Sequence, residues 1–165
     1  MAKVPEVLLR CFYCDPHRTW GAVEQSRLAP MTSPELPYPQ IDGTLMESMG
    51  MVITHVEPGC VKASMPVMGN LQPYGLLHGG ANAALAETVG SIAGGMHAGS
   101  DGVSLGLELN CTHHKAVRSG SVHAVATPIH EGSSTATYAI AITDDEGNLT
   151  CTARLTCVIR KRSRN

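Results

Sequence analysis

Residues 75–97, GLLHGGANAALAETVGSIAGGMH, contain the only strong helical pattern after residue 41. From residue 79 onward, large apolar residues recur at the three- and four-residue spacing of a helix that packs on a core: Leu85, Val89, Ile92 and Met96. Glu87 lies on the other side of this helix and is the only Asp, Glu, Lys or Arg between His78 and His97. We therefore predict one long helix over residues 79–97.

The residues around Glu87 are small. Gly90, Gly94 and several alanines stand where a surface helix would carry Lys, Gln or Arg. Glycine inside a helix costs about 0.5–1 kcal/mol relative to alanine, so we expect another group to come close at these positions. In one interpretation that group is another helix or subunit, and Glu87 is a surface charge. In the other, the small face admits a ligand on which Glu87 acts.

The segments on both sides of the helix alternate between apolar and polar residues, as half-buried strands do. Two such strands precede the helix and four follow it: residues 49–57, 60–67, 103–114, 121–130, 134–143 and 149–160. This order predicts an α+β fold, with one helix laid across an antiparallel sheet of about six strands. One helix cannot cover both faces of such a sheet, which favours a homo-oligomer.

The chain of 165 residues is long enough for one domain. Residues 28–41 carry four prolines, which is typical of a linker or an extended segment. We predict an N-terminal extension with a Pro-rich linker over residues 1–41, one domain over residues 42–162 and a short tail over residues 163–165.

The composition excludes several classes of protein. A hydrophobic content of 43% with 16% charged residues argues against a disordered chain. A net charge of −2 and an aromatic content of 4% provide neither the basic field nor the stacking residues of a nucleic-acid-binding protein. The sequence shows no pattern of a signal peptide or a membrane span, so we expect a cytoplasmic protein that does not bind membranes.

The cysteines and histidines do not suggest a metal centre. The six cysteines are expected to be reduced thiols in the cytoplasm, and Cys11 and Cys14 form a lone C-x-x-C motif without a second pair of ligands. His113 and His114 are neighbours on a predicted strand and would point to opposite faces, so they cannot chelate one metal together. By the same argument, at most one of them should line a pocket.

The start of the helix suggests acyl-transfer chemistry. Gly79 and Gly80 follow His78, and unpaired N–H groups at a helix N-terminus favour an anion or a developing oxyanion. Glu87 follows about two turns later. An oxyanion pocket and a carboxylate at this spacing resemble half of an acyl-transfer site.

The segment from Gly75 to Ser91 resembles the hotdog-fold acyl-CoA thioesterases, in the branch of the Glu-type 4-hydroxybenzoyl-CoA and 1,4-dihydroxy-2-naphthoyl-CoA thioesterases. Residues 107–114 (LELNCTHH), 128–134 (PIHEGSS) and 145–151 (DEGNLTC) extend the match. The resemblance implies a curved antiparallel sheet wrapped around one long helix. It also implies hydrolysis of a CoA thioester, with coenzyme A only as part of substrate and product and with no metal or cofactor.

The resemblance also assigns roles in catalysis. Glu87 would act as nucleophile or as general base on water, and the N–H of Gly79 would polarise the thioester carbonyl. Gln72 would orient the thioester or the water, and Ser91 would hold that water. His78 would hold the loop or contact the carbonyl oxygen.

For binding of CoA or the acyl group, the resemblance and the chain's basic and small polar residues suggest a larger set: Lys115, Arg118, His113, His130, Ser133, Ser134 and Arg160. Family sites lie between two subunits, so a dimer or a tetramer of two hotdog dimers is expected. Two alternatives are a non-catalytic acyl-CoA-binding module and a dehydratase that acts on 3-hydroxyacyl thioesters.

Overall fold

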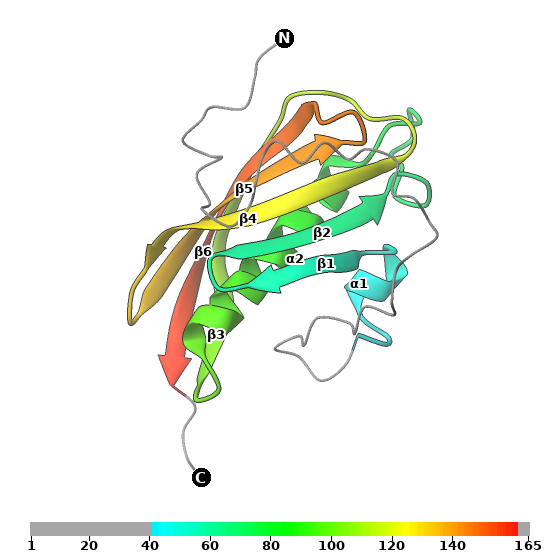
Figure 1. The fold of residues 1–165 in the computed structure, drawn as a ribbon. Helices are drawn as coiled ribbons and strands as arrows, with labels where there is room; N and C mark the ends of the chain where they lie inside the picture. Colours follow the sequence, from blue (N-terminus) through cyan, green and yellow to red (C-terminus); the bar gives the residue numbers. More distant parts are fainter. Residues whose placement is uncertain (1–40, 162–165) are drawn as a thin grey trace, which may run out of the picture.

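The computed structural model describes residues 41–161, which form one antiparallel sheet and one long helix (Figure 1). In chain order the elements are α1 (Leu45–Ser48), β1 (Val52–Glu57), β2 (Cys60–Pro66), α2 (Gly79–Ala98), β3 (Gly102–His113), β4 (Ser121–Glu131), β5 (Thr135–Asp144) and β6 (Leu149–Lys161). The predicted order of strands and helix is confirmed, with ends within three residues of those expected. The single turn of α1 is too short to give a periodic pattern and was not predicted.

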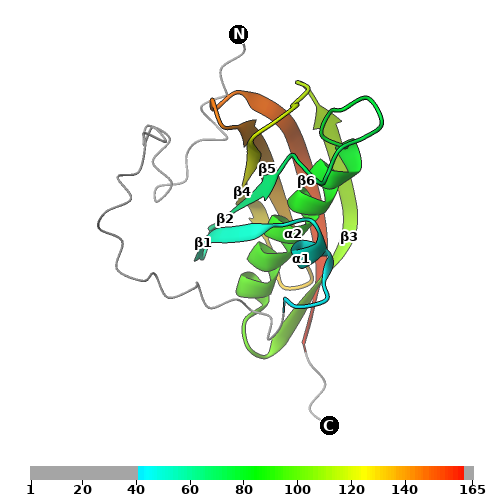
Figure 2. The same ribbon diagram turned by 90° about the vertical axis from the view of Figure 1, so that its right-hand side faces the viewer.

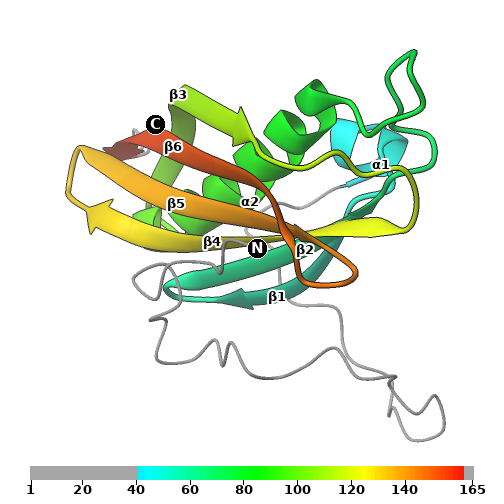
Figure 3. The ribbon, with the colours of Figure 1, turned by 90° about the horizontal axis from the view of Figure 1, so that it is seen from above.

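The six strands pair in the order β1-β2-β4-β5-β6-β3, and every pair is antiparallel. The edges of the sheet are therefore β1 and β3. Seen from the side and from above, the sheet curves around α2, which lies in its concave face (Figures 2 and 3). This is the predicted α+β arrangement, in which one helix supplies most of the core on its side of the sheet.

The apolar stripe of α2 fills this core. Leu85, Val89 and Ile92 are completely buried, whereas Met96 near the end of the helix is only half-buried. Strands β2, β4, β5 and β6 supply the opposing side chains, among them Met65, Val122, Ile140 and Leu155. These contacts fix the rotation of α2 about its axis, so they also fix where its polar residues point.

Gly90 and Gly94 are buried against the sheet of the same chain. A Cβ at residue 90 would lie 2.6 Å from Leu155 Cδ2 of β6. A Cβ at residue 94 would lie 3.4 Å from Cys157 Sγ and would overlap Ser104 Oγ of β3. The group that comes close to Gly90 and Gly94 is therefore the curved sheet of their own chain, and not another helix or subunit.

The cysteine prediction is confirmed only in part. Cys111, Cys151 and Cys157 are free thiols, but Cys60 is disulfide-bonded. Composition alone does not tell which sulfur atoms the fold brings together. Cys11, Cys14, nearly all of the predicted extension and the predicted tail lie outside the described residues.

Within residues 41–161, no helix is long and apolar enough to cross a membrane.

Candidate active site

The start of α2 is held by His78. This residue is the N-cap, with extended backbone (φ −67°, ψ 133°), and its Nδ1 accepts a hydrogen bond of 2.8 Å from the N–H of Gly80. Its own N–H donates to Asn70 O at 2.9 Å, which ties the cap to the preceding loop. Of the two roles considered for His78, the structure supports holding the loop.

The N–H of Gly79 is the free donor at this helix end. An α-helix leaves its first N–H groups without a partner in the helix, and His78 satisfies the one at Gly80. Within residues 41–161, the Gly79 N–H has no hydrogen-bond acceptor. The positive end of the helix dipole adds to its ability to bind a partly negative oxygen.

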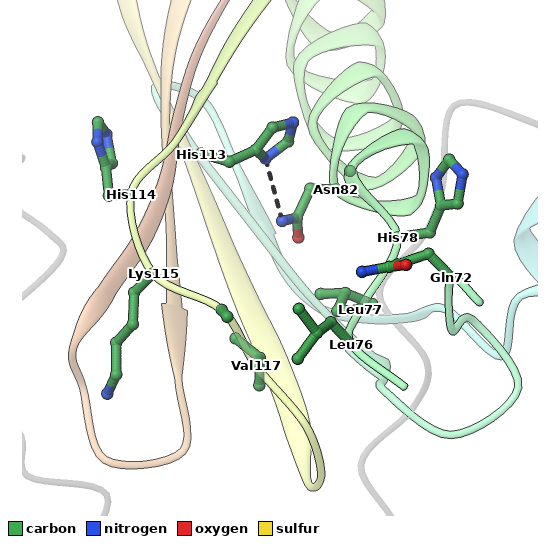
Figure 4. Close-up of a pocket in the computed structure, with 11 residues that line it drawn as sticks. Gln72, Leu76, Leu77, His78, Asn82, His113, His114, Lys115 and Val117 are labelled. Carbon is green, nitrogen blue, oxygen red and sulfur yellow. Dashed lines mark hydrogen bonds between the residues drawn. The ribbon is translucent and has the colours of Figure 1, made fainter. Parts of the chain in front are cut away.

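Gln72 lies in the loop that leads to this helix. Its backbone N–H donates to Leu76 O at 2.8 Å, and its carbonyl oxygen accepts from the N–H of Gly75 at 2.9 Å. Its side-chain Oε1 accepts from the N–H of Tyr74 at 2.9 Å. Since Oε1 is used inside the loop, the amide nitrogen is the end of Gln72 that remains for a ligand. The loop thus brings Gln72 beside His78 (Figure 4).

A pocket of about 420 Å³ opens between the first turn of α2 and the end of β3 (Figure 4). Its lining includes five of the predicted site residues: Gln72, His78, Gly79, His113 and Lys115. The remaining lining residues are Leu76, Leu77, Asn82, His114, Ala116 and Val117. The pocket lining thus combines polar side chains, among them Gln72, Asn82 and His113, with the apolar side chains of Leu76, Leu77 and Val117.

His113 and His114 point to opposite sides, as predicted. His113 Nδ1 lies 3.5 Å from Asn82 Nδ2 of α2, whereas His114 Nε2 lies 2.9 Å from Thr152 Oγ1 of β6. Both nevertheless belong to the pocket lining, so the prediction that at most one of them does is wrong. Strand β3 ends at His113, and strict alternation no longer applies to the loop residue beyond it.

Asn82 was not singled out from the sequence. It lies in the first turn of α2, is 5% exposed and lines the pocket next to His113. The sequence feature that could have marked Asn82 is its amide side chain, which stands among alanines and glycines at the start of the helix.

Glu87 lies further along α2 and faces edge strand β3. Ser91 Oγ, one helical turn later, donates a hydrogen bond of 3.3 Å to its Oε1. The carboxylate lies against the backbone of Gly106, where a Cβ would overlap Oε1 and would be 3.1 Å from Cδ. The register of β3 with β6 shifts between Gly106 and Glu108, so the strand is irregular at the point where it meets the carboxylate.

Two thiols, Cys111 and Cys157, lie near Glu87. Burial raises the pKa of both Cys111 and Cys157, and the negative charge of Glu87 raises each further. A thiol attacks a thioester as the thiolate, and a raised pKa keeps that form scarce at neutral pH. Glu87 carries a carboxylate, which is a group that can attack a carbonyl or activate water.

Glu87 and Gly79 are separated along the helix axis. They are eight residues apart, and a rise of 1.5 Å per residue places them about 12 Å apart in one chain. The pocket that contains Gly79 does not include Glu87 in its lining. One chain therefore presents the two candidate groups at separate places.

The predicted CoA-binding residues fall into two groups. Lys115 and Arg118 follow the end of β3, and Lys115 Nζ forms an ion pair of 2.7 Å with Asp144. Burial raises the pKa of Asp144, but hydrogen bonds from Lys115 and Asn148 outweigh it and hold that pKa below its usual value. The Lys115 ammonium is thus already partly neutralised.

The second group lies at the other end of the sheet. Arg160 pairs with Val103 at the start of β3, and Ser134 O accepts from the N–H of Ile159 at 2.8 Å. His130 and Ser133 adjoin Ser134 in the turn between β4 and β5. Strand β3 has 12 residues, and a rise of about 3.3 Å per residue puts the two groups about 36 Å apart along it in one chain.

Comparison with known proteins identifies the family. A family model described as the thioesterase superfamily matches residues 74–151. The proofreading thioesterase EntH of Klebsiella pneumoniae is 43% identical over 115 residues, which are 69% of this chain and 84% of that protein.

Solved structures agree in sequence and in fold. A thioesterase of Haemophilus influenzae superposes with a TM-score of 0.70 and 37% identity over 73% of this chain and 85% of its own. A mutant thioesterase of Pseudomonas aeruginosa superposes with a TM-score of 0.72 and 34% sequence identity, and the match covers 80% of this chain and 98% of that one. With its antiparallel sheet wrapped around one long helix, the chain belongs to the thioesterase superfamily, has the hotdog fold and is a thioester hydrolase.

Proposed function

We propose that the chain hydrolyses an acyl- or aroyl-CoA thioester to the free acid and CoA, with Glu87 as the reacting carboxylate and the Gly79 N–H as the oxyanion donor. One observation carries this proposal. The same helix offers an unpaired N–H to a pocket and holds a carboxylate, with Ser91 bonded to it, against edge strand β3. The proposed reaction requires no metal or cofactor, and the cytoplasmic location remains a prediction.

Glu87 can promote hydrolysis in two ways. As a general base it takes a proton from a water that attacks the carbonyl carbon, and the C–S bond then breaks as that proton passes to the CoA sulfur. As a nucleophile its oxygen attacks the same carbon and expels the CoA thiolate, and water then hydrolyses the mixed anhydride. In both routes the carbonyl oxygen becomes negative, and the Gly79 N–H stabilises it there.

We infer that Glu87 and Gly79 of one active site come from different copies of the chain. The separation of about 12 Å along α2 is too long for both groups to reach one thioester carbon. Edge strand β3 offers a place for the second copy, because Leu105 and Leu107 on it are 58% and 66% exposed. An unpaired edge with exposed apolar side chains favours association with another strand.

The same arrangement would unite the two groups of CoA-binding candidates. If β3 pairs antiparallel with β3 of a second copy, the Lys115 end of one chain lies beside the Arg160 end of the other. Lys115 and Arg118 would then share the CoA phosphates with His130, Ser133, Ser134 and Arg160 of the partner subunit. We propose this homodimer as the smallest active unit, and a pair of such dimers as the complete assembly.

Release of CoA thiol from a panel of acyl-CoAs tests the proposal. The panel runs from acetyl-CoA to palmitoyl-CoA and includes benzoyl-CoA, and an enzyme-only blank corrects for the protein's own thiols. Glu87→Gln should lower kcat at least about 100-fold, because the amide neither attacks nor accepts a proton. Glu108→Gln is the matched control, since Glu108 is an exposed β3 carboxylate that bonds to Arg154 at 3.5 Å.

Three results would count against the proposal. Full turnover by Glu87→Gln would show that this carboxylate is not the reacting group. An equal loss in Glu108→Gln would point to a general effect on β3. If the folded wild-type protein released thiol from no member of the panel, CoA would not be the acyl carrier.

A further inference from the structure

Cys60 is completely buried although it does not belong to the hydrophobic core. It is the first residue of β2, at the turn of the β1–β2 hairpin, and it is 0% exposed. Val61, Ala63 and Met65 belong to the core cluster that packs on α2, whereas Cys60 is not a member of it. Since side chains alternate along a strand, Cys60 points to the convex face of the sheet, away from α2. The group that covers it must therefore lie on that face.

Cys60 is also disulfide-bonded, and its partner does not come from residues 41–161. The other cysteines in this part of the chain are free thiols: Cys111, Cys151 and Cys157. The chain has six cysteines, so the two that remain are Cys11 and Cys14 of the C-x-x-C motif. Within one chain, only these two can supply the partner of Cys60.

The convex face beside Cys60 carries mostly short side chains. Val125 of β4 pairs with Ala141 of β5, and Thr127 pairs with Ala139 in the next row. All four are half-buried and alternate with core residues, so they share the face to which Cys60 points. Helix α2 lies on the opposite, concave side (Figures 2 and 3). A surface of small and β-branched residues fits an extended segment laid across the strands.

The 40 residues that precede the described part are long enough to reach this place. The described part begins beside α1, which a hydrogen bond of 2.9 Å from the N–H of Met51 to Met46 O holds at the start of β1. Strand β1 has 6 residues, so its other end, next to Cys60, is about 20 Å away. The four prolines of residues 28–41 favour an extended chain, and this stretch alone would span about 43 Å as polyproline II.

We propose that residues 1–40 dock on the convex face of the sheet at the β1–β2 hairpin and are held there by a disulfide between Cys60 and either Cys11 or Cys14. The S–S bond forms when each of the two thiols gives up a proton and an electron, and a disulfide oxidant such as oxidised glutathione is reduced to two thiols. The other cysteine of the motif stays a thiol. This inference goes beyond the proposed function and does not depend on it, because neither the convex face nor these thiols take part in the proposed reaction.

Peptide mapping tests the bond in the full-length protein. The folded protein is equilibrated with reduced and oxidised glutathione, its free thiols are blocked with iodoacetamide in denaturant, and it is digested with trypsin without a reductant. Trypsin places Cys11 and Cys14 in one peptide (residues 11–18) and Cys60 in another (residues 28–62). Mass spectrometry should find these two peptides linked, and a reductant should separate them.

Substitutions identify the sulfur atoms. Cys60→Ser, and the double variant Cys11→Ser with Cys14→Ser, should each abolish the linked pair. Cys111→Ser is the matched control and should keep it, because Cys111 is a free, half-buried thiol on β3. A bond between Cys11 and Cys14 in place of the linked pair, or complete modification of Cys60 by iodoacetamide, would overturn the proposal. So would a Cys60 disulfide between two copies, which a non-reducing gel shows as a covalent dimer.

Docking is measured separately, by native proteolysis of the oxidised protein. Trypsin cuts an undocked segment quickly after Arg18 and Arg27, whereas a docked segment must first come away from the sheet. Cleavage of the wild-type protein should be at least about tenfold slower than cleavage of Cys60→Ser. Ala139→Arg, which places a long side chain on the convex face, should also speed cleavage. Equal rates in the wild-type protein and these two variants would overturn the docking of residues 1–40 on this face.

Discussion

The N–H of Gly79 is the donor on which the proposed reaction depends, and it can be removed without disturbing the helix. Gly79 is the first residue of α2, where proline is well tolerated because its missing N–H has no partner in the helix. His78 before it already has the extended backbone that a residue before proline adopts. Gly79→Pro therefore deletes one hydrogen-bond donor without breaking a hydrogen bond of the helix, and it adds a Cβ that Gly79→Ala adds as well.

We expect Gly79→Pro to lower kcat about 100- to 1,000-fold relative to Gly79→Ala. Gly79→Ala is the matched control, because it keeps the N–H but adds the same Cβ as proline does. That Cβ would lie 2.8 Å from His113 Nε2, and the His113 side chain is exposed. Steady-state thiol release from the two variants measures the difference. Equal rates would mean that no backbone donor acts at this position.

Gly106 is glycine for a steric reason. Its φ is not in the left-handed region, but the Glu87 carboxylate occupies the space of its missing side chain. Gly106→Ala should therefore displace the carboxylate and lower kcat more than it raises KM. Aspartate is one methylene shorter than glutamate and leaves room for the added Cβ. The double variant Gly106→Ala with Glu87→Asp should therefore retain a larger fraction of the wild-type kcat than the product of the fractions that the two single variants retain.

A double-mutant cycle on kcat checks this coupling. If the effects of Gly106→Ala and Glu87→Asp simply multiply, Gly106 does not position Glu87. Thermal unfolding of the four proteins separates this result from a loss of folded protein, because a purely structural role of Gly106 gives no rescue by the shorter carboxylate.

At this scale the sequence predicted local relationships but not tertiary ones. Glu87 and Ser91 are four residues apart in the predicted helix, a spacing that places two residues on the same helix face. The contacts of Asn82 and Gly106 depend on His113 and Glu87, which the fold brings to them from other elements. One sequence gives no measure of such contacts.

Helix α2 is the element in which the close packing of the fold is concentrated. Gly90 lies under Leu155, and alanine there would place a Cβ 2.6 Å from Leu155 Cδ2. Alanine is favoured over glycine in a helix by about 0.5–1 kcal/mol. Overpacking of a core costs about 1–3 kcal/mol, which is the larger effect.

Gly90→Ala should therefore destabilise the protein by about 1–2 kcal/mol, despite its better helix propensity. Chemical denaturation of the wild-type and variant proteins measures this difference. Thr88→Ala provides a comparison on the same helix at a half-buried position. A stability gain in Gly90→Ala would show that α2 and β6 are less closely packed than the structure indicates.

The sequence predicted the limits of the helix and strands better than it predicted which of these elements lie side by side. Strand and helix limits followed from alternation and from turn residues, and the core stripe of Leu85, Val89 and Ile92 was identified from helical spacing. The pattern of β3 did not reveal that it pairs with β6 at the edge of the sheet. It therefore did not reveal that Gly90 and Gly94 face the strands of their own chain.

At the scale of the whole molecule, the two groups of the proposed reaction lie apart in one chain. The sheet holds Gly79 beside the end of β3 and Glu87 beside its middle, with about 12 Å of helix between them. The sequence suggested an oligomer because one helix cannot cover both faces of the sheet. The spacing of Glu87 and Gly79 is a separate argument for the proposed dimer, since in the proposed reaction both groups act on one thioester carbon.

The most direct test of this account is complementation between two inactive subunits. Glu87→Gln and Gly79→Pro chains, with different affinity tags, are co-expressed, and the hybrid assembly is purified and assayed for thiol release. If each site takes Glu87 from one chain and Gly79 from the other, a hybrid dimer contains one intact and one doubly altered site. It should then have about half of the wild-type activity per dimer. Hybrid dimers no more active than the two parent proteins would contradict the shared site.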